Sequence, residues 1–263
     1  MTNTARSAYA SPFGVKTLII IGAVVFFITL ARLAPASMVL FFVDPEEHGV
    51  SYTALEGTLW RGRARGVSYQ AVPLGDVDYR LHAFALLRLT AKADLTASGG
   101  TVRGEGAVAA SLFGGTMRIR DAAVDIDVGR FASSGIFGGP IEGLANLTLK
   151  EAEFDRSGCT KISGQFWTDI MNAAAKRFQR AEFPMRGALA CSRGDLLMAM
   201  SGTNVDGSAD LDIRVRPDAS YEISATARSN IENVGTALLY FGFEESNGAY
   251  TYGSTGVLKG PGS

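Results

Sequence analysis

Apolar and polar residues alternate along most of the chain beyond residue 76, which is the pattern of strands that bury one face. The run over 87–97 shows it best: every odd-numbered residue is Leu or Ala, and every even-numbered one is Arg, Lys, Asp or Thr. The same pattern predicts strands over 77–83, 87–97, 102–110, 116–120, 124–128, 141–154, 160–167, 185–191, 195–200, 209–216, 221–228 and 250–258.

Two segments depart from this alternation and predict short helices, over 169–179 and 231–241. In the first, apolar residues recur at a spacing of four, as on one face of a helix. Parallel strands would need a crossover of a dozen or more residues, usually helical, between successive strands, and the sequence offers too few. We therefore expect a mainly β fold: a mostly antiparallel sheet, curved or partly closed, with one or two short helices.

An uncharged segment over 17–31 predicts a membrane helix near the N-terminus. Arg6 and Lys16 precede it, and no acidic residue does. Because positive charge is retained on the cytoplasmic side, the N-terminus should lie inside and the C-terminus outside. We expect three parts: a cytoplasmic tail over 1–16, a transmembrane anchor over 17–36, and an exported β-rich domain over 37–263.

A cleaved signal peptide is the alternative, since Ala34-Pro35-Ala36 resembles a small-x-small cleavage site. Arg32 lies between the apolar run and that site, and Pro35 lies inside it. Cleavage would also leave the apolar run over 37–43 at the start of the mature protein. These features favour a retained anchor, and both interpretations export the rest of the chain.

Composition narrows the function classes. The chain of 263 residues is 47% hydrophobic with a formal net charge of −1, which gives no reason to expect a nucleic-acid partner. Its two cysteines, Cys159 and Cys191, both lie in the exported region. An even count in an oxidising compartment favours a disulfide, and two separate buried thiols are the alternative.

Candidate chemistry is sparse. His48 and His82 are the only histidines, and neither has a metal-ligand spacing; His82 fits a solvent-facing strand position. No G-x-S-x-G nucleophile elbow is present. Two acidic groups are better explained as solvent-facing strand positions than as calcium ligands. Their members are Asp121, Asp125 and Asp127, and Asp206, Asp210 and Asp212. We expect no enzyme activity, no metal and no cofactor.

The most distinctive block in the chain has the form G-T-[LV]-W-x-G-x-A and follows shortly after Pro35-Ala36. It resembles protein N of the type II secretion system, the general secretion pathway protein N family. The residues that carry the resemblance are Gly57, Thr58, Leu59, Trp60, Gly62 and Ala64. From the residues alone, Trp60 is interpreted as a core anchor of the first hairpin, with a membrane-proximal or partner-facing position as the alternative.

Two later blocks follow the same family. Gly164-Gln165-Phe166-Trp167 has the form G-x-[FV]-W, and the segment from Met185 to Gly194, which contains Cys191, approximates L-x-G-x-x-x-C-x-x-G. The resemblance implies a single-pass protein of the bacterial inner membrane with its bulk in the periplasm. It also implies contacts with other type II secretion components.

Three functions remain at this point. The favoured one is a secretion component that acts through protein–protein contacts in protein export. The alternative is an AsmA-like β-groove that binds or transfers lipid in the envelope, because the family is similar to AsmA-like proteins and the strands have one apolar face. An exported enzyme is the least favoured.

Overall fold

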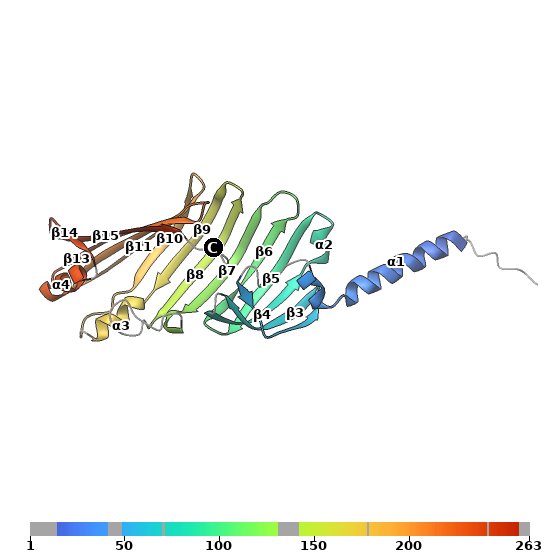
Figure 1. Cartoon of the computed structure of the whole chain (residues 1–263), viewed down its shortest axis with the longest axis horizontal. Coiled ribbons are helices and arrows are strands. Elements are labelled where there is room, and N and C mark those ends of the chain that lie inside the picture. The colour runs from blue at the N-terminus through green and yellow to red at the C-terminus, as the bar shows by residue number, and fades with distance from the viewer. Residues whose placement is uncertain are drawn as a thin grey trace, which may run out of the picture.

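Fifteen strands form a single antiparallel sheet in the computed structural model, which describes residues 15–41, 49–69, 72–130, 142–177, 179–240 and 242–257 (Figure 1). The strands are β1 (Val50–Ser51), β2 (Ala54–Thr58), β3 (Arg61–Tyr69), β4 (Val72–Leu81), β5 (Thr90–Gly99), β6 (Val102–Ser111), β7 (Met117–Asp127), β8 (Leu144–Asp155), β9 (Gly158–Thr168), β10 (Met185–Ser192), β11 (Asp195–Asn204), β12 (Gly207–Val215), β13 (Ser220–Ser229), β14 (Glu244–Ser246) and β15 (Ala249–Val257). The helical elements are α1 (Val15–Leu33), η1 (Ala36–Phe41), α2 (Ala83–Leu86), η2 (Val128–Arg130), α3 (Ile170–Arg177) and α4 (Glu232–Tyr240).

From β3 to β13 each strand pairs with the next one along the chain. Both β1 and β2 pair with β3 at one end of the sheet, and β14 pairs with β15 at the other. The mainly β, antiparallel prediction is therefore confirmed, and the sheet is open rather than partly closed. Figure 1 shows α2, α3 and α4 at strand ends, so they do not form a second layer.

The two faces of the sheet differ because side chains alternate along each strand. On one face, a row across neighbouring strands runs from Leu147 through Phe166 and Gly187 to Met200. The core cluster lies on this face. It consists of the buried residues Ala122, Leu149 and Leu189, with Ile119, Leu147, Ile162, Leu196 and Met198 packed against it.

The predicted strands correspond to β4–β13 and β15, whereas β1, β2, β3 and β14 lie outside the predicted ranges. Two further differences have a clear physical reason. The predicted strands over 116–120 and 124–128 are one continuous strand, β7. Its pairing with β6 is irregular around Asp121, which has a φ of +48°. This irregularity returns Ala122 to the apolar face, where it is buried opposite Leu149. A break in alternation inside a strand therefore resembles a turn at the level of sequence.

The second difference concerns the segment before β5. The alternation predicted a strand from residue 87, whereas the strand begins at Thr90 after α2 and a turn. Leu87 and Leu89 are 81% and 55% exposed instead of facing the core. The predicted helices over 169–179 and 231–241 are present as α3 and α4.

Within the described residues, no helix combines the length and the apolar character that crossing a membrane requires. The predicted anchor over 17–36 therefore stays a prediction, and α1 covers most of that range. The predicted tail over 1–16 lies almost wholly outside the described residues.

Candidate functional site

The block with the form G-T-[LV]-W-x-G-x-A forms the hairpin between β2 and β3, and its glycines are required by close contacts. Gly57 has a φ of +102°, which side chains rarely allow. A Cβ on Gly62 would lie 2.5 Å from the hydroxyl oxygen of Tyr79. That hydroxyl donates a 2.9 Å hydrogen bond to the carbonyl of Thr58. The glycine at 62 therefore lets the Tyr79 side chain cross the hairpin.

This hairpin attaches the end of α1 to the sheet. The backbone N–H of Leu59 donates to the carbonyl of Ala34 at 2.8 Å, and Pro35 forms an isolated β-bridge with Thr58. Ala36, the next residue, is only 2% exposed. The motif residues therefore hold the segment that follows α1 against the first strands.

Trp60 lies in the turn of the same hairpin. Its carbonyl accepts a 2.8 Å hydrogen bond from the backbone N–H of Leu81, which ties the turn to the end of β4. Trp60 as a whole is partly buried and does not belong to the buried core. Trp60 is neither fully buried, as a core anchor would be, nor fully exposed, and it lies in the hairpin that attaches the end of α1. Its position therefore combines features of the core-anchor and the membrane-proximal interpretations.

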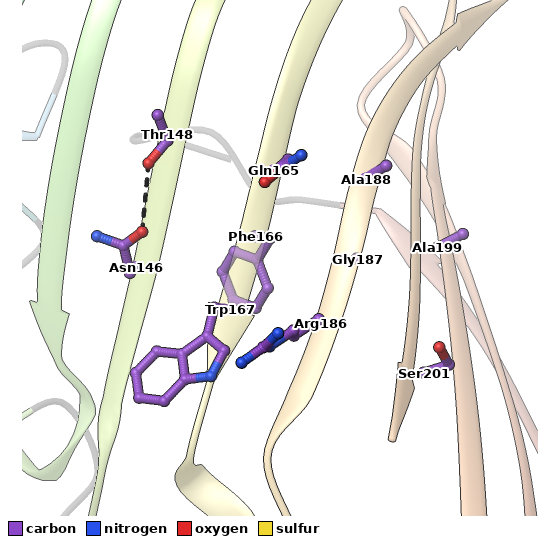
Figure 2. Close-up of a pocket in the computed structure, with 10 residues that line it drawn as sticks. All are labelled: Asn146, Thr148, Gln165, Phe166, Trp167, Arg186, Gly187, Ala188, Ala199 and Ser201. Carbon is purple, nitrogen blue, oxygen red and sulfur yellow. Dashed lines mark hydrogen bonds between the residues drawn. The ribbon is translucent and has the colours of Figure 1, made fainter. Parts of the chain in front are cut away.

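The two later family blocks lie side by side as β9 and β10. Their register places Trp167 opposite Arg186, Phe166 opposite Gly187 and Gln165 opposite Ala188. Figure 2 shows the Trp167 ring and the Arg186 guanidinium next to each other on the polar face of the sheet. Blocks that are about twenty residues apart in the sequence therefore meet at one place.

A hollow of about 740 Å³ spans these strands and their neighbours, β8 and β11. Besides residues of β9 and β10, it is lined by Asn146, Thr148, Ala199 and Ser201. The Thr148 hydroxyl donates to the side-chain carbonyl of Asn146 at 3.3 Å, and the Asn146 amide donates to Asp125 at 2.7 Å. The hollow therefore offers hydrogen-bonding groups around one indole and one guanidinium.

Small residues keep this hollow open. Ala188 and Ala199 lie opposite each other between its polar side chains. A Cβ on Gly187 would lie 2.7 Å from Cγ of Met200, and one on Gly164 would lie 2.5 Å from Cδ2 of Leu149. These two glycines thus leave room for core side chains on the apolar face directly beneath the hollow.

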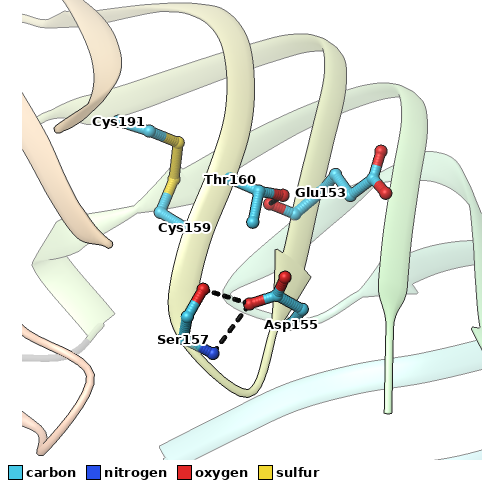
Figure 3. Close-up of a disulfide and its surroundings, with 6 residues drawn as sticks. All are labelled: Glu153, Asp155, Ser157, Cys159, Thr160 and Cys191. Atoms are coloured by element: carbon cyan, nitrogen blue, oxygen red, sulfur yellow. Dashed lines mark hydrogen bonds between the residues drawn. A yellow bond between two sulfur atoms is a disulfide. The ribbon is translucent and has the colours of Figure 1, made fainter. Parts of the chain in front are cut away.

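A disulfide joins Cys159 of β9 to Cys191 of β10, with Cα atoms 5.4 Å apart (Figure 3). The regular pairing of these strands ends at the Gly164–Leu189 pair. Beyond it, the backbone N–H of Cys159 donates to the carbonyl of Gly194 at 2.8 Å. The disulfide therefore extends the connection between the two strands past the end of their ladder.

The turn beside the disulfide is stabilised by its own side chains. Ser157 donates from its backbone N–H and its hydroxyl to the Asp155 carboxylate, at 2.7 and 2.5 Å. These hydrogen bonds favour the charged carboxylate and so lower the pKa of Asp155. The hydroxyl of Thr160 donates to the carbonyl of Glu153 at 3.0 Å across the same turn (Figure 3).

The remaining candidates do not form a reaction centre in the described part of the chain. His82 contacts Asp94 at 2.8 Å on the sheet surface, and His48 lies outside the described residues. The acidic candidates are spread over strands and turns; Asp125 accepts from Asn146, and Asp206 accepts from the Ala181 N–H. No three His, Cys, Asp or Glu side chains among the described residues converge as metal ligands.

These features define a class of protein: an open, single-layer antiparallel sheet with a helix attached at one edge and a disulfide that joins two central strands. A sequence profile of the family described as type II secretion system, protein N matches residues 48–252. The chain belongs to this family, so it is a type II secretion component, and the resemblance found in the sequence is confirmed.

One relative shows how far the similarity extends. The type II secretion system protein N of Vibrio cholerae serotype O1 is 25% identical over 235 residues. The match covers 81% of this chain and 87% of the relative. No solved structure matches the chain.

Proposed function

We propose that this chain is anchored in the bacterial inner membrane by residues 17–36 and acts in type II secretion through contacts of its periplasmic sheet, residues 37–263, with other secretion components. Residues 1–16 form the cytoplasmic tail. One observation carries the contact proposal: two family blocks meet at one hollow on the exposed polar face. The proposal includes no catalytic step, metal or cofactor.

The chemistry of the hollow supports a protein partner. Arg186 is exposed and Trp167 partly so, and they lie next to each other. Trp and Arg are the residues most enriched among those that contribute strongly to protein–protein binding. The surrounding amide and hydroxyl groups of Asn146, Thr148 and Ser201 suit the polar rim of such an interface.

The surface of α1 supports the anchor. Its apolar side chains are exposed on all sides of the helix: Leu18, Ile19, Ile20, Ile21, Val24, Val25, Phe26 and Leu30 are each 48–64% exposed. A helix that is apolar all round is found in a protein core or in a membrane. Figure 1 shows α1 projecting away from the sheet, and none of the described strands or other helices packs around it.

The test changes the hollow without changing the fold. Arg186→Glu and Trp167→Ala should each reduce secretion and co-purification with other secretion components, while the protein level and the melting temperature stay near wild type. Arg228→Glu is the matched control, because Arg228 is an exposed arginine of β13 that does not line the hollow. Normal secretion by both hollow variants would refute the contact proposal.

Lipid binding of the AsmA kind is a second candidate, and a separate observation favours it. The apolar face continues over β12 and β13, where Ile213 lies opposite Ile223 and Leu211 opposite Ala225. None of the helices in the described part of the chain forms a layer over the sheet (Figure 1). A contiguous apolar surface that is not covered can hold acyl chains. Native mass spectrometry of detergent-extracted protein should then detect bound lipid, and lipid-free protein would count against this candidate.

A further inference from the structure

Two connections between strands, which lie at the same side of the sheet where the strands end, expose large apolar side chains. Phe84 and Leu87, in and after α2, are 85% and 81% exposed, and Phe113, between β6 and β7, is 77% exposed. Leu89 and Leu112 are about half exposed. The backbone N–H of Leu112 donates to the carbonyl of Leu89 at 2.9 Å, so the two connections touch. These five residues are called the apolar edge below.

The apolar edge lies at the end of the sheet where α1 is attached. Two backbone hydrogen bonds, each 2.8 Å long, connect the segment after α1 to the apolar edge. The N–H of Leu59 in the β2–β3 hairpin donates to the carbonyl of Ala34, and the N–H of Leu81 at the end of β4 donates to the carbonyl of Trp60 in the same hairpin. Leu81 ends β4, immediately before His82 and α2. Figure 1 shows α2 and the start of the sheet-bound chain after α1 at the same end.

Exposed apolar residues also continue along the chain between α1 and this edge. Leu33, the last residue of α1, is 70% exposed, and Met38 in η1 is 49% exposed. Burying side chains as large as those of Phe84, Leu87 and Phe113 is favourable, because it removes large apolar surfaces from water. Their exposure to water is therefore unfavourable in free energy unless a membrane or another apolar surface covers them.

Exposed arginines lie near the apolar edge. Arg61 and Arg80 lie directly opposite each other on β3 and β4, and both are exposed, as is Arg88 beside Leu87. Asp94, the acidic residue opposite Arg80 on β5, contacts His82. Apolar side chains with neighbouring arginines match the interface of a bilayer that contains anionic lipid.

We propose that the apolar edge inserts Phe84, Leu87 and Phe113 into the membrane surface beside α1, so that the sheet has a second membrane contact and a fixed orientation. This inference rests on the proposal that α1 is the membrane anchor. The membrane is the occupant that the structure favours, because the hydrogen bonds of Leu59 with Ala34 and of Leu81 with Trp60 place the patch at the end of the sheet where α1 is attached.

The test uses the full chain, reconstituted into vesicles made of equal parts of phosphatidylethanolamine and phosphatidylglycerol. Single cysteines at Phe84→Cys, Phe113→Cys, Ile20→Cys or Val205→Cys carry a polarity-sensitive fluorophore, while Cys159 and Cys191 are joined to each other. Lipids with brominated acyl chains quench any fluorophore in the bilayer. Val205 is the matched control, since it is 82% exposed in the turn between β11 and β12, at the opposite edge.

The probes at positions 84 and 113 should shift their emission to shorter wavelength and lose most of their fluorescence, whereas the probe at 205 should lose none. The probe at position 20 reports on α1 separately. Quenching at 20 without quenching at 84 and 113 would overturn this inference and leave the anchor intact. Absence of quenching at 20 would refute the anchor. Because the vesicles contain no other protein, a protein partner for the patch would appear as an unquenched probe, which also overturns the inference.

Discussion

Individual residues of the β2–β3 hairpin explain why its sequence is so distinctive. Gly57 takes a backbone conformation with positive φ, and Gly62 leaves space for the hydroxyl of Tyr79. Ala64 lies between Leu55 and Val77 on the apolar face. Each small residue therefore answers a specific steric demand of the strand pairing.

Gly62→Ala should lower the free energy of unfolding by about 1–3 kcal/mol, because the new Cβ would press on the Tyr79 hydroxyl and on the carbonyl of Glu56. Gly253→Ala is the control, since a Cβ there meets no atom within 4 Å. Thermal melting of both variants provides the measurement. Equal melting temperatures for Gly62→Ala and wild type would show that the hairpin tolerates a side chain at this position.

Reduction of the Cys159–Cys191 disulfide should lower stability by about 3–4 kcal/mol, because the bond closes a loop between residues 32 apart in sequence. Melting curves with and without reductant give the size of the effect. The double variant Cys159→Ser with Cys191→Ser should melt at one temperature under both conditions. Free reaction of both thiols with a maleimide in denatured, unreduced protein would contradict the prediction.

At the scale of elements, β9 and β10 form the central unit of the sheet. Their pairing creates the Trp167–Arg186 neighbours on one face and adds Leu189 to the core cluster on the other. The disulfide joins the same two strands. A change on the apolar face is therefore expected to disturb the hollow, whereas a change in the hollow should leave the core in place.

Leu149→Ala tests how much the core cluster contributes to the stability of the sheet. Leu149 is 8% exposed and belongs to the cluster with Ala122 and Leu189, so its truncation should cost about 2–5 kcal/mol. Val205→Ala, at a position 82% exposed, should change stability by less than about 0.5 kcal/mol. Urea unfolding followed by tryptophan fluorescence measures both variants. Similar midpoints for the two would mean that the cluster contributes little.

At the scale of the whole molecule, the sheet is a single open layer whose strands follow chain order. Its apolar face has no covering layer among the residues that the structure describes, its polar face has a hollow, and it has two ends. One end is attached to α1 through the β2–β3 hairpin. The molecule thus presents different chemistry in each direction, which suits a component placed between a membrane and other proteins.

The proposed topology makes a direct prediction for the whole chain. A reporter that is active only outside the cytoplasm, fused after Ser263, should be active in cells, and the mature protein should keep its N-terminal residues. We expect activity because Arg6 and Lys16, which precede the apolar segment, favour a cytoplasmic N-terminus. A mature chain beginning at Ser37 would refute the retained anchor but not export, whereas an inactive reporter would refute export.

Much of the fold was predictable because alternation is a local property. Each residue's neighbours in sequence decide which face its side chain takes, so β4–β13, β15, α3, α4 and the apolar and polar faces could be inferred from the chain alone. The prediction for the segment before Thr90 is wrong for the same reason: Leu87 and Leu89 alternate as in a strand, yet they lie in a connection and are exposed. The strands β1, β2, β3 and β14 lie outside the predicted ranges.

Only the tertiary structure shows which residues far apart in the sequence lie next to each other. The sequence supplied Trp167 and Arg186 in separate blocks, but only the register of β9 and β10 made them neighbours. The attachment of Ala34 to Leu59 and the contact between Leu89 and Leu112 likewise join segments far apart in the chain. Register is set by long-range pairing and packing of whole strands, and no pattern within one segment contains that information.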